Sequence, residues 1–366
     1  MDLILKYAGE PSVPIKLGTD VIVSVRPGAT VVIMGPTGSG KSSTTIGMLN
    51  AHDGPVVVLS RELPAEELAA RAIGMQCDAS WEDVLTGKVP RREMERVIFP
   101  RAYVLDRKDA TLGALEAAIK AAQAEHPGER VLAAIDYLQI MESDKREERA
   151  RIADVVARVD EIARSTRAVV LAISQMSRAS SRAARTGEVI GADSTDGGAE
   201  SAAIERAATV TLSLGASGPE REDGSRTVEL SIGKSRMGGG DRVIPLTYWG
   251  RTGRCRIAGE ARSAAEVKAE RGGQRNAALV AAAVQAMLAG AERSSAPLTR
   301  EQLDEHAVAA MGTCTKSIKA QARAALASKG LVVEVLRKTP RARHHLLWTP
   351  AKAAAAGIPL AKDGEA

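Results

Sequence analysis

The segment GPTGSGKS (residues 35–42) decides the fold class of this chain, because it joins a glycine-rich turn to a lysine and a serine. It fits the pattern G-x-x-x-x-G-K-[ST], follows the apolar run ATVVIMG (29–35) and opens a helical pattern. Glycines let successive backbone N–H groups turn toward phosphate oxygens, and the start of the helix adds its dipole. Strand, glycine loop and helix in this order predict a binding site for a nucleoside triphosphate in an α/β domain.

Two side chains of this loop have specific tasks in such a site. Lys41 provides a cation for the β- and γ-phosphates, and the hydroxyl of Ser42 is a ligand for Mg²⁺. We therefore expect ATP as the bound nucleotide and Mg²⁺ as its cofactor. The residues expected to bind the nucleotide are Gly35, Pro36, Thr37, Gly38, Ser39, Gly40, Lys41, Ser42 and Ser43.

Apolar, β-rich runs continue on both sides of the loop, with helical patterns between them. Most runs are nearly continuous in hydrophobicity, as in parallel strands that are buried on both faces of a sheet. This alternation predicts an α/β fold with a mostly parallel, twisted sheet and right-handed crossovers. The expected strands are 29–35, 54–60, 102–106, 130–136, 167–174, 208–214 and 227–233, and the clearest helix is 146–166.

ATP hydrolysis needs a carboxylate that holds the metal and a general base, and the sequence offers a candidate for each. Asp136 ends the run RVLAAID (130–136), where a carboxylate can hold the hydrated metal. Glu62 lies just past the strand 54–60 and is the best-placed general base. Because Pro64 and Glu66 follow it, a carboxylate at a helix start explains Glu62 equally well. The spacing alone leaves both interpretations of Glu62 open.

Composition limits the class of protein. A chain of 366 residues has room for one large domain and a small one, and 45% hydrophobic residues exclude a disordered chain. Aromatic residues make up only 2%, so a nucleic-acid surface would depend on charge and backbone amides rather than on stacking. The net charge of +5 weakly favours a polyanionic partner.

Cysteine spacing and the N-terminal sequence indicate in which cellular compartment the protein is expected. Cys77, Cys255 and Cys314 match no metal-ligand spacing, and free thiols in a reducing compartment are expected. The N-terminal MDLILKYAGEPSVP lacks an apolar core of signal-peptide length, and no run approaches a membrane span. We expect a cytoplasmic protein without a membrane partner.

The composition changes after residue 258. We expect an ATPase domain at 1–258, a polar linker at 259–276, a winged-helix domain at 277–350 and a flexible tail at 351–366. The winged helix is predicted from three helical patterns, with a Thr299/Gln302 capping pair, and two short strands. Its third helix and wing indicate contact with the DNA backbone, although such modules also bind proteins. The cations expected there are Lys316, Lys319, Arg323, Arg337, Lys338, Arg341 and Arg343.

Six stretches, in this order, resemble the ATPase domain of DnaB-type hexameric replicative helicases, within the RecA-like ATPases. The resemblance covers about residues 20–256, and DYLQ followed by SQMSR is much more specific than the phosphate loop. The stretches are GPTGSGKS (35–42), VVVLSRELPAEELAARAIG (56–74), IDYLQIM (135–141), LAISQMSR (171–178), ESAAIERAATVTL (200–212) and GKSRMGGGDRVIPLTYWGRTGR (233–254).

The resemblance implies catalytic roles for individual residues. Glu62 matches the catalytic base, and Asp136 matches the metal-site aspartate. Gln175 matches the sensor of the γ-phosphate, although a satisfied amide at a strand end is the alternative. Lys234 and Arg236 match a hairpin that reaches the neighbouring subunit's γ-phosphate, so with Lys41 these residues form the expected catalytic set. By residue type alone, a solvated hairpin remains the alternative for Lys234 and Arg236.

Two departures from the family pattern affect its DNA-binding and assembly parts. The phosphate loop is reached by residue 35, so we expect no helical collar or linker helix, as in collar-less plasmid RepA-type helicases. The family usually has an arginine and a glycine around the Glu-Ser pair, where this chain has Ala199 and Ala202. The long polar loop 178–200 carries cations that would compensate. The residues expected to contact single-stranded DNA are Arg178, Arg182, Arg185, Glu200 and Ser201.

The expected function is that of an ATP-dependent DNA helicase or translocase. It would act in the replication of a plasmid, phage or mobile element, as a homohexameric ring on single-stranded DNA. The winged helix would bind duplex DNA or a replication protein. The alternatives are an ATP-switched DNA-binding replication or regulatory factor without unwinding activity, and a RecA-like recombination or repair ATPase.

Overall fold

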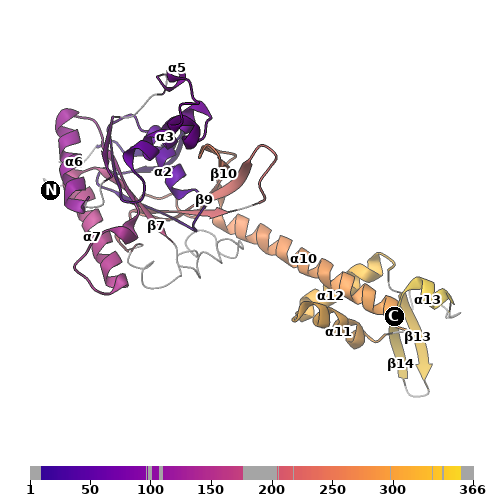
Figure 1. Ribbon diagram of the computed structural model, residues 1–366. Coiled ribbons are helices and arrows are strands. Elements are labelled where there is room, and N and C mark those ends of the chain that lie inside the picture. Colours follow the sequence, from indigo (N-terminus) through magenta and orange to yellow (C-terminus); the bar gives the residue numbers. More distant parts are fainter. Residues whose placement is uncertain are drawn as a thin grey trace. The chain divides into compact units, whose positions relative to one another are not determined.

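The chain forms two compact units, Met1–Val267 and Lys268–Ala366, in the computed structural model (Figure 1). The residues that the structure describes are 10–95, 97, 101–106, 110–175, 204, 206–216, 218–296, 298–331, 333–339 and 342–355.

A ten-stranded mixed sheet forms the centre of the first unit. Its strand order is β11-β10-β9-β8-β3-β7-β6-β4-β5, with β12 beside β10. The strands are β3 (Thr30–Gly35), β4 (Val56–Ser60), β5 (Ala102–Leu105), β6 (Leu132–Asp136), β7 (Val169–Gln175), β8 (Val210–Ala216), β9 (Ser225–Ser235), β10 (Arg242–Trp249), β11 (Cys255–Ile257) and β12 (Arg262–Ser263).

Six neighbouring strands, from β8 to β5, run parallel, which confirms the predicted α/β class. Every residue of β3 and β4 is buried, as the unbroken apolar runs predicted. On the other side of β8, the strands β9, β10 and β11 are antiparallel. Each of the seven strands predicted from the sequence overlaps an observed strand.

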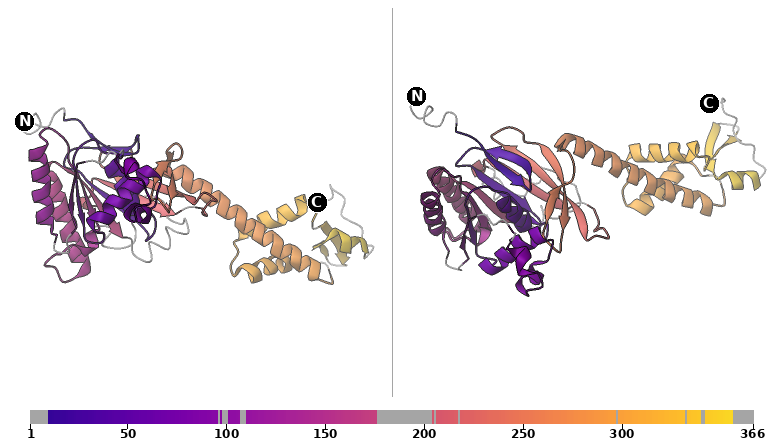
Figure 2. Two further views of the ribbon diagram at one scale, coloured as in Figure 1. Left: turned by 45° about the horizontal axis from the view of Figure 1, so that its top comes forward. Right: turned by 90° about the horizontal axis from the view of Figure 1, so that it is seen from above.

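Helices cover both faces of the sheet (Figure 2). One face packs against α2 (Lys41–Asn50), α3 (Ala65–Cys77) and the hairpin of β1 (Val13–Leu17) and β2 (Asp20–Val25). The other face packs against α6 (Leu112–Glu125) and α7 (Glu148–Thr166). The helix predicted at 146–166 is thus confirmed, and its apolar stripe is buried. The short helices α4 (Trp81–Leu85) and α5 (Arg91–Met94) follow α3.

The direction of the strands gives the sheet two distinct edges. The parallel strands end together at one edge, where Gly35 pairs with Gln175 and Ser60 pairs with Asp136. We call this the carboxyl edge. Strand β9 runs against β8, and its last residue, Ser235, pairs with Val210, the first residue of β8. The end of β9 therefore lies at the opposite edge, which we call the amino edge.

The second unit contains most of one long helix, two further helices and an antiparallel strand pair. The helices α10 (Ala264–Arg293), α11 (Arg300–Met311) and α12 (Lys316–Ser328) share an apolar core, and β13 (Val333–Thr339) pairs with β14 (Ala342–Trp348). The predicted capping box is confirmed, because Thr299 and Gln302 exchange hydrogen bonds at the start of α11. The assignment of this unit as a winged helix remains a prediction.

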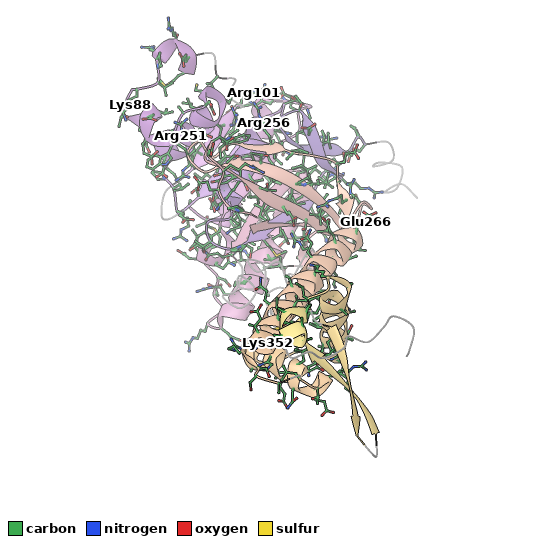
Figure 3. All side chains as sticks on the ribbon, turned by 90° about the vertical axis from the view of Figure 1, so that its right-hand side faces the viewer. Lys88, Arg101, Arg251, Arg256, Glu266 and Lys352 are labelled. Carbon is green, nitrogen blue, oxygen red and sulfur yellow. The ribbon has the colours of Figure 1, made fainter. Side chains whose placement is uncertain are left out.

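Two stretches contain more regular structure than expected. The stretch 259–276, expected to be a linker, contains β12 and the first part of α10. A second capping box explains this start, because Ser263 and Glu266 exchange hydrogen bonds of 2.9 and 3.1 Å; Glu266 is labelled in Figure 3. The tail expected at 351–366 begins within a short helix, α13 (Pro350–Ala355).

Two further observations concern cysteines and membranes. Cys77, Cys255 and Cys314, which all lie in described segments, are free. Burial raises the pKa of the Cys255 thiol to about 11, so this side chain packs in the core rather than acting as a nucleophile. In the described ranges, no helix is both long and apolar enough to cross a membrane.

Candidate active site

The phosphate loop joins β3 to α2, and its backbone requires glycine. Gly38 and Gly40 have positive φ angles of 76° and 91°, which other residues rarely adopt. A Cβ atom at Gly35 would lie 2.6 Å from Ser39 Oγ and 2.8 Å from the carbonyl oxygen of Leu214. The close approach of β8 at this point therefore excludes a side chain at Gly35.

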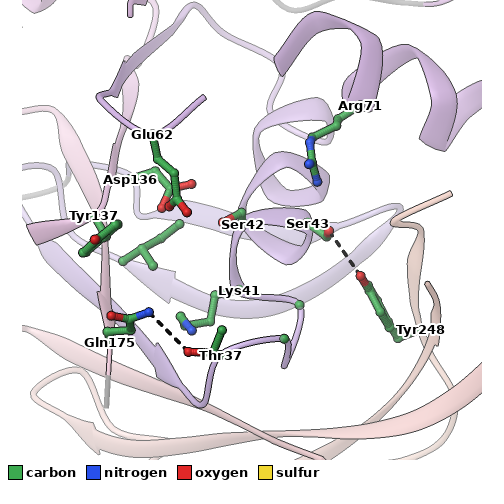
Figure 4. Close-up of a pocket in the computed structure, with 13 residues that line it drawn as sticks. Thr37, Lys41, Ser42, Ser43, Glu62, Arg71, Asp136, Tyr137, Gln175 and Tyr248 are labelled. Atoms are coloured by element: carbon green, nitrogen blue, oxygen red, sulfur yellow. Dashed lines mark hydrogen bonds between the residues drawn. The ribbon is translucent and has the colours of Figure 1, made fainter. Parts of the chain in front are cut away.

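A pocket of about 220 Å³ opens above this loop at the carboxyl edge of the sheet (Figure 4). It collects residues from the ends of four parallel strands and from α3 and β10, which are distant in the sequence. The lining residues are Thr37, Gly38, Gly40, Lys41, Ser42, Ser43, Glu62, Arg71, Asp136, Tyr137, Ile173, Gln175 and Tyr248.

Lys41 is the first residue of α2 and holds the loop closed. Its ammonium group donates hydrogen bonds of 2.9 Å to the carbonyl oxygens of both Gly35 and Pro36. Burial lowers the pKa of Lys41, while the nearby carboxylates of Asp136 and Glu62 oppose this shift. The cation therefore faces two acidic groups across the pocket.

Asp136 ends β6 and is almost fully buried. Burial raises the pKa of its carboxyl group, and the neighbouring Glu62 adds to this shift. A hydrogen bond with Ser42 and the positive charges of Lys41 and Arg71 act in the opposite direction. Ser42 and Asp136 thus place a hydroxyl and a carboxylate next to each other beside the phosphate loop (Figure 4).

These residues fit a nucleotide with Mg²⁺. Mg²⁺ is commonly bound through one or two carboxylates together with substrate phosphates, and Ser42 and Asp136 supply the protein part of such a set. Ser39 Oγ is buried and has no hydrogen-bond partner in the described part of the chain, so a polar group facing the loop lacks its partner. No group of three acidic, histidine or cysteine side chains that could hold a metal by itself occurs among the described residues.

Glu62 lies in the short connection between β4 and α3, and it is exposed. The first turn of α3 instead carries Glu66 and Glu67, and Pro64 precedes it. Glu62 therefore stands outside the helix and lines the pocket, close enough to Asp136 and Lys41 to influence the pKa of both.

Gln175 is the last residue of β7 and lies in register with Gly35 of the phosphate loop. Its side-chain amide donates a hydrogen bond of 3.3 Å to Thr37 Oγ1, within the loop (Figure 4). The amide is therefore attached to a phosphate-loop residue and is not merely satisfied within its own strand.

Sequence reasoning missed three residues of the site. Arg71 on α3 lines the pocket, pairs with Glu67 and lies 5.4 Å over the ring of Trp81. Tyr248 on β10 lies 3.5 Å from Ser43 Oγ through its hydroxyl. Arg226 lies 5.0 Å over the Tyr248 ring and donates to the Gly38 carbonyl oxygen.

Local motifs do not mark these three residues. Arg71 and Tyr248 are inside stretches that resemble the helicase family, but neither belongs to a loop whose chemistry can be identified from spacing. They reach the site only because α3 and β10 pack against the phosphate loop. Such tertiary contacts cannot be identified from local sequence.

Lys234 and Arg236 are absent from the pocket that their own chain forms. The backbone N–H of Lys234 donates to Thr211 Oγ1 at 3.0 Å, and that of Arg236 donates to the Thr209 carbonyl oxygen at 3.0 Å. The guanidinium group of Arg236 donates to the carbonyl oxygen of Arg206. Both cations therefore lie by the first residues of β8, at the amino edge.

The residues expected to bind DNA are only partly described. Arg178, Arg182, Arg185, Glu200, Ser201 and Arg341 lie outside the described residues. Arg337, Lys338 and Arg343 belong to β13 and β14, and for them the structure gives only the strand backbone.

The cations on α12 differ among themselves. Lys316 is exposed at the start of the helix, and Lys319 is half-buried. Arg323 forms an ion pair with Asp304 of α11, and its side chain is 26% exposed. The charge of Arg323 is therefore already matched within the unit.

The sequence model of the DnaB-like helicase C-terminal domain matches residues 19–254. The replicative DNA helicase DnaB of Synechocystis sp. is 24% identical over 160 residues, which cover 41% of this chain and 18% of that protein. The chain thus spans less than a fifth of the curated relative that it matches.

Two solved structures share the fold. The ATPase domain of G40P has a TM-score of 0.56 and 20% identity, with 64% of this chain and 86% of that chain covered. A DnaB-like replicative helicase, solved in a study of its interactions with primase, has a TM-score of 0.53 and 19% identity. The similarity covers 63% of this chain and 59% of that one.

Proposed function

Because the chain belongs to the family of DnaB-like helicase C-terminal domains, a family of ATP-hydrolysing P-loop enzymes, we propose that it hydrolyses ATP to move along DNA during replication. The match over residues 19–254 confirms the resemblance predicted from the sequence. The observation that carries the proposal is the convergence of Lys41, Glu62, Asp136 and Gln175 in one pocket at the carboxyl edge.

Each of these residues has a chemical task in hydrolysis. The phosphate loop and Lys41 bind and neutralise the phosphates, and Glu62 accepts the proton of the attacking water. Ser42 and Asp136 hold Mg²⁺, which when bound neutralises charge on the phosphate oxygens. Gln175, attached to Thr37 of the loop, responds to the presence of the terminal phosphate.

We propose further that the active site is shared between two copies of the chain. Lys234 and Arg236 lie at the amino edge, so the fold keeps them away from the pocket of their own chain. A head-to-tail contact that sets the amino edge of one copy against the carboxyl edge of the next would bring them to the neighbour's phosphates. Contacts of this kind form a closed ring when the rotation between copies closes, and the homohexamer of the family's type is such a ring.

The second unit supports a role beyond hydrolysis alone. We propose that α12 and the β13–β14 hairpin contact duplex DNA, with Lys316 and Lys319 as the described cations on α12. Docking on a replication protein is the alternative use of the same unit. A protein that carries such a module beside its ATPase suits the replication of a plasmid, phage or mobile element.

The experiment that tests the proposed function measures ATP hydrolysis with Mg²⁺, with and without single-stranded DNA, and strand displacement on a forked duplex. We expect DNA to stimulate hydrolysis, and the Lys41→Ala variant to show neither activity. Slow hydrolysis that single-stranded DNA does not change, together with duplex binding, would instead identify an ATP-switched DNA-binding factor. Filaments in place of rings in electron micrographs would indicate a recombination-type ATPase.

A further inference from the structure

Gln139 belongs to the DYLQ stretch but does not line the pocket. It lies on the single-turn helix η1 (Leu138–Ile140), three residues after Asp136. Two neighbours fix this turn in the core, because Leu138 and Met141 are almost fully buried. The backbone that carries Gln139 is therefore firmly placed directly after the metal-site carboxylate.

The side chain of Gln139 bonds to the last two residues of β7. Its Nε2 donates to Ser174 Oγ at 3.0 Å and to the Gln175 carbonyl oxygen at 3.1 Å. Its Oε1 accepts a bond of 3.3 Å from the backbone N–H of Gln175. One amide thus binds both backbone polar groups of the residue expected to sense the γ-phosphate.

Sheet register explains why this bonding is needed. The pairing of β7 with β6 ends at Ile135 and Ala172, whereas β7 continues to Gln175 beside β3. On the β6 side, the last residues of β7 have no strand partner, and the Gln139 side chain occupies the place of one. On this side, the Gln139 side chain takes the place of a continued ladder, while on the other side β3 pairs with Gln175.

The same turn also connects to the general base. Arg61, next to Glu62, donates a hydrogen bond of 3.1 Å to the carbonyl oxygen of Ile140 and pairs with Glu142. The turn after Asp136 therefore contacts the segment that carries Glu62 on one side and the strand end that carries Gln175 on the other.

We propose that Gln139 is a positioning residue, which holds the end of β7 so that the Gln175 amide faces Thr37 of the phosphate loop. The proposal rests on the proposed ATP hydrolysis. Gln139 touches neither the phosphate loop nor the other pocket groups in any described contact, so it acts through Gln175.

The kinetic test compares Gln139→Ala, Gln139→Glu, Gln175→Ala and the double variant Gln139→Ala/Gln175→Ala. Gln139→Ala removes all three bonds, and Gln139→Glu preserves size but removes the two donated ones. We expect either variant to lower the DNA-stimulated kcat about tenfold, with KM for ATP changed less than about twofold. In the Gln175→Ala background, Gln139→Ala should cause no further loss.

A matched control separates positioning from stability. Gln123 on α6 donates a comparable hydrogen bond, of 2.6 Å, to the carbonyl oxygen of Thr166, far from the pocket. Gln123→Ala should leave the DNA-stimulated kcat within about twofold of the unmodified protein. An equal loss of kcat in Gln123→Ala, or an equal factor lost in the presence and absence of the Gln175 side chain, would overturn the proposal.

Hydrogen exchange gives a readout that does not depend on activity. The N–H of Gln175 should exchange about tenfold faster in Gln139→Ala than in the unmodified chain. It should remain close to the unmodified rate in Gln139→Glu, which keeps the accepting oxygen, and in Gln123→Ala. Unchanged exchange in Gln139→Ala would refute the positioning role, even if the chain hydrolyses ATP. Faster exchange in a chain that hydrolyses no ATP would instead support the positioning of Gln175 and refute only the proposed function.

Discussion

The two edges of the central sheet carry groups of the same chemistry in very different settings. At the carboxyl edge, Lys41 lies in a pocket with Glu62 and Asp136. At the amino edge, Lys234 and Arg236 lie beside the first residues of β8. The backbone carbonyl oxygens of Arg206 and Thr209 accept the side-chain and main-chain bonds of Arg236. Of the three cations proposed to act in hydrolysis, only Lys41 lines the pocket of its own chain, where Arg71 lies as well.

Under the proposed function, this difference would separate nucleotide binding from catalysis. A single copy has the groups that hold the phosphates, while the cations that would neutralise the transition state are at the other edge of the sheet. Hydrolysis would then require a second copy, and the reaction would be tied to assembly.

The largest effect is expected at the carboxyl edge. Lys41→Ala removes the cation that binds the phosphates in every copy, so both nucleotide affinity and hydrolysis should fall. We expect kcat/KM for ATP to decrease by at least about 10³-fold, measured together with the Kd for a fluorescent ATP analogue. Tight binding of the analogue by Lys41→Ala would show that the pocket is not the nucleotide site.

At the amino edge, Arg236→Ala should impair ATP hydrolysis without impairing ATP binding. Because Arg236 is outside the pocket of its own chain, the Kd for ATP should change less than about threefold, whereas kcat should fall about 10³-fold. Isothermal titration calorimetry and steady-state hydrolysis give the two values. A near-normal kcat would show that Arg236 does not take part in ATP hydrolysis, and that the amino edge does not contribute to the active site.

Lys234→Ala should have a smaller effect at the same edge. An ammonium group is a point charge, whereas a guanidinium group can form two parallel hydrogen bonds with phosphate oxygens. We expect kcat to fall about tenfold to a hundredfold, again with little change in the Kd for ATP. A loss that exceeds that of Arg236→Ala would reverse the proposed order of the two cations.

The smallest effect is expected in the second unit, on α12. Lys316→Ala should weaken duplex binding a few-fold and lower the salt dependence by about one phosphate contact, measured by fluorescence anisotropy at several salt concentrations. Arg323→Ala is the comparison, because Arg323 already pairs with Asp304 and should affect the stability of the unit more than its DNA affinity. The same salt dependence in Lys316→Ala as in the unmodified chain would favour protein docking.

The sequence predicted the carboxyl edge well, since its signals are local. Each of Lys41, Glu62, Asp136 and Gln175 follows or ends an apolar run, and parallel strands bring their ends together. The amino edge needed information from the structure, because the position of Lys234 and Arg236 depends on the antiparallel pairing of β9 with β8. That pairing is a long-range contact without a local signature.

The same reasoning accounts for the errors. The stretch 259–276 is polar, which favoured a linker, but Ser263 and Glu266 form a capping box that starts α10 within it. The sequence contains the S-x-x-E pattern of a capping box, but the linker was predicted from the polar composition of the stretch. Tyr248, Arg226 and Arg71 were missed because their place in the site follows from the packing of β9, β10 and α3 around the phosphate loop.

Mixing two inactive variants tests the shared active site most directly. Arg236→Ala keeps an intact phosphate loop, and Lys41→Ala keeps an intact Arg236, so an interface between them restores one complete site. We predict that a 1:1 mixture, assembled from dissociated chains, regains up to about a quarter of the unmodified activity, as random placement in a ring requires. Mixed assemblies that form but hydrolyse no ATP above the level of either variant alone would contradict a site built from two copies.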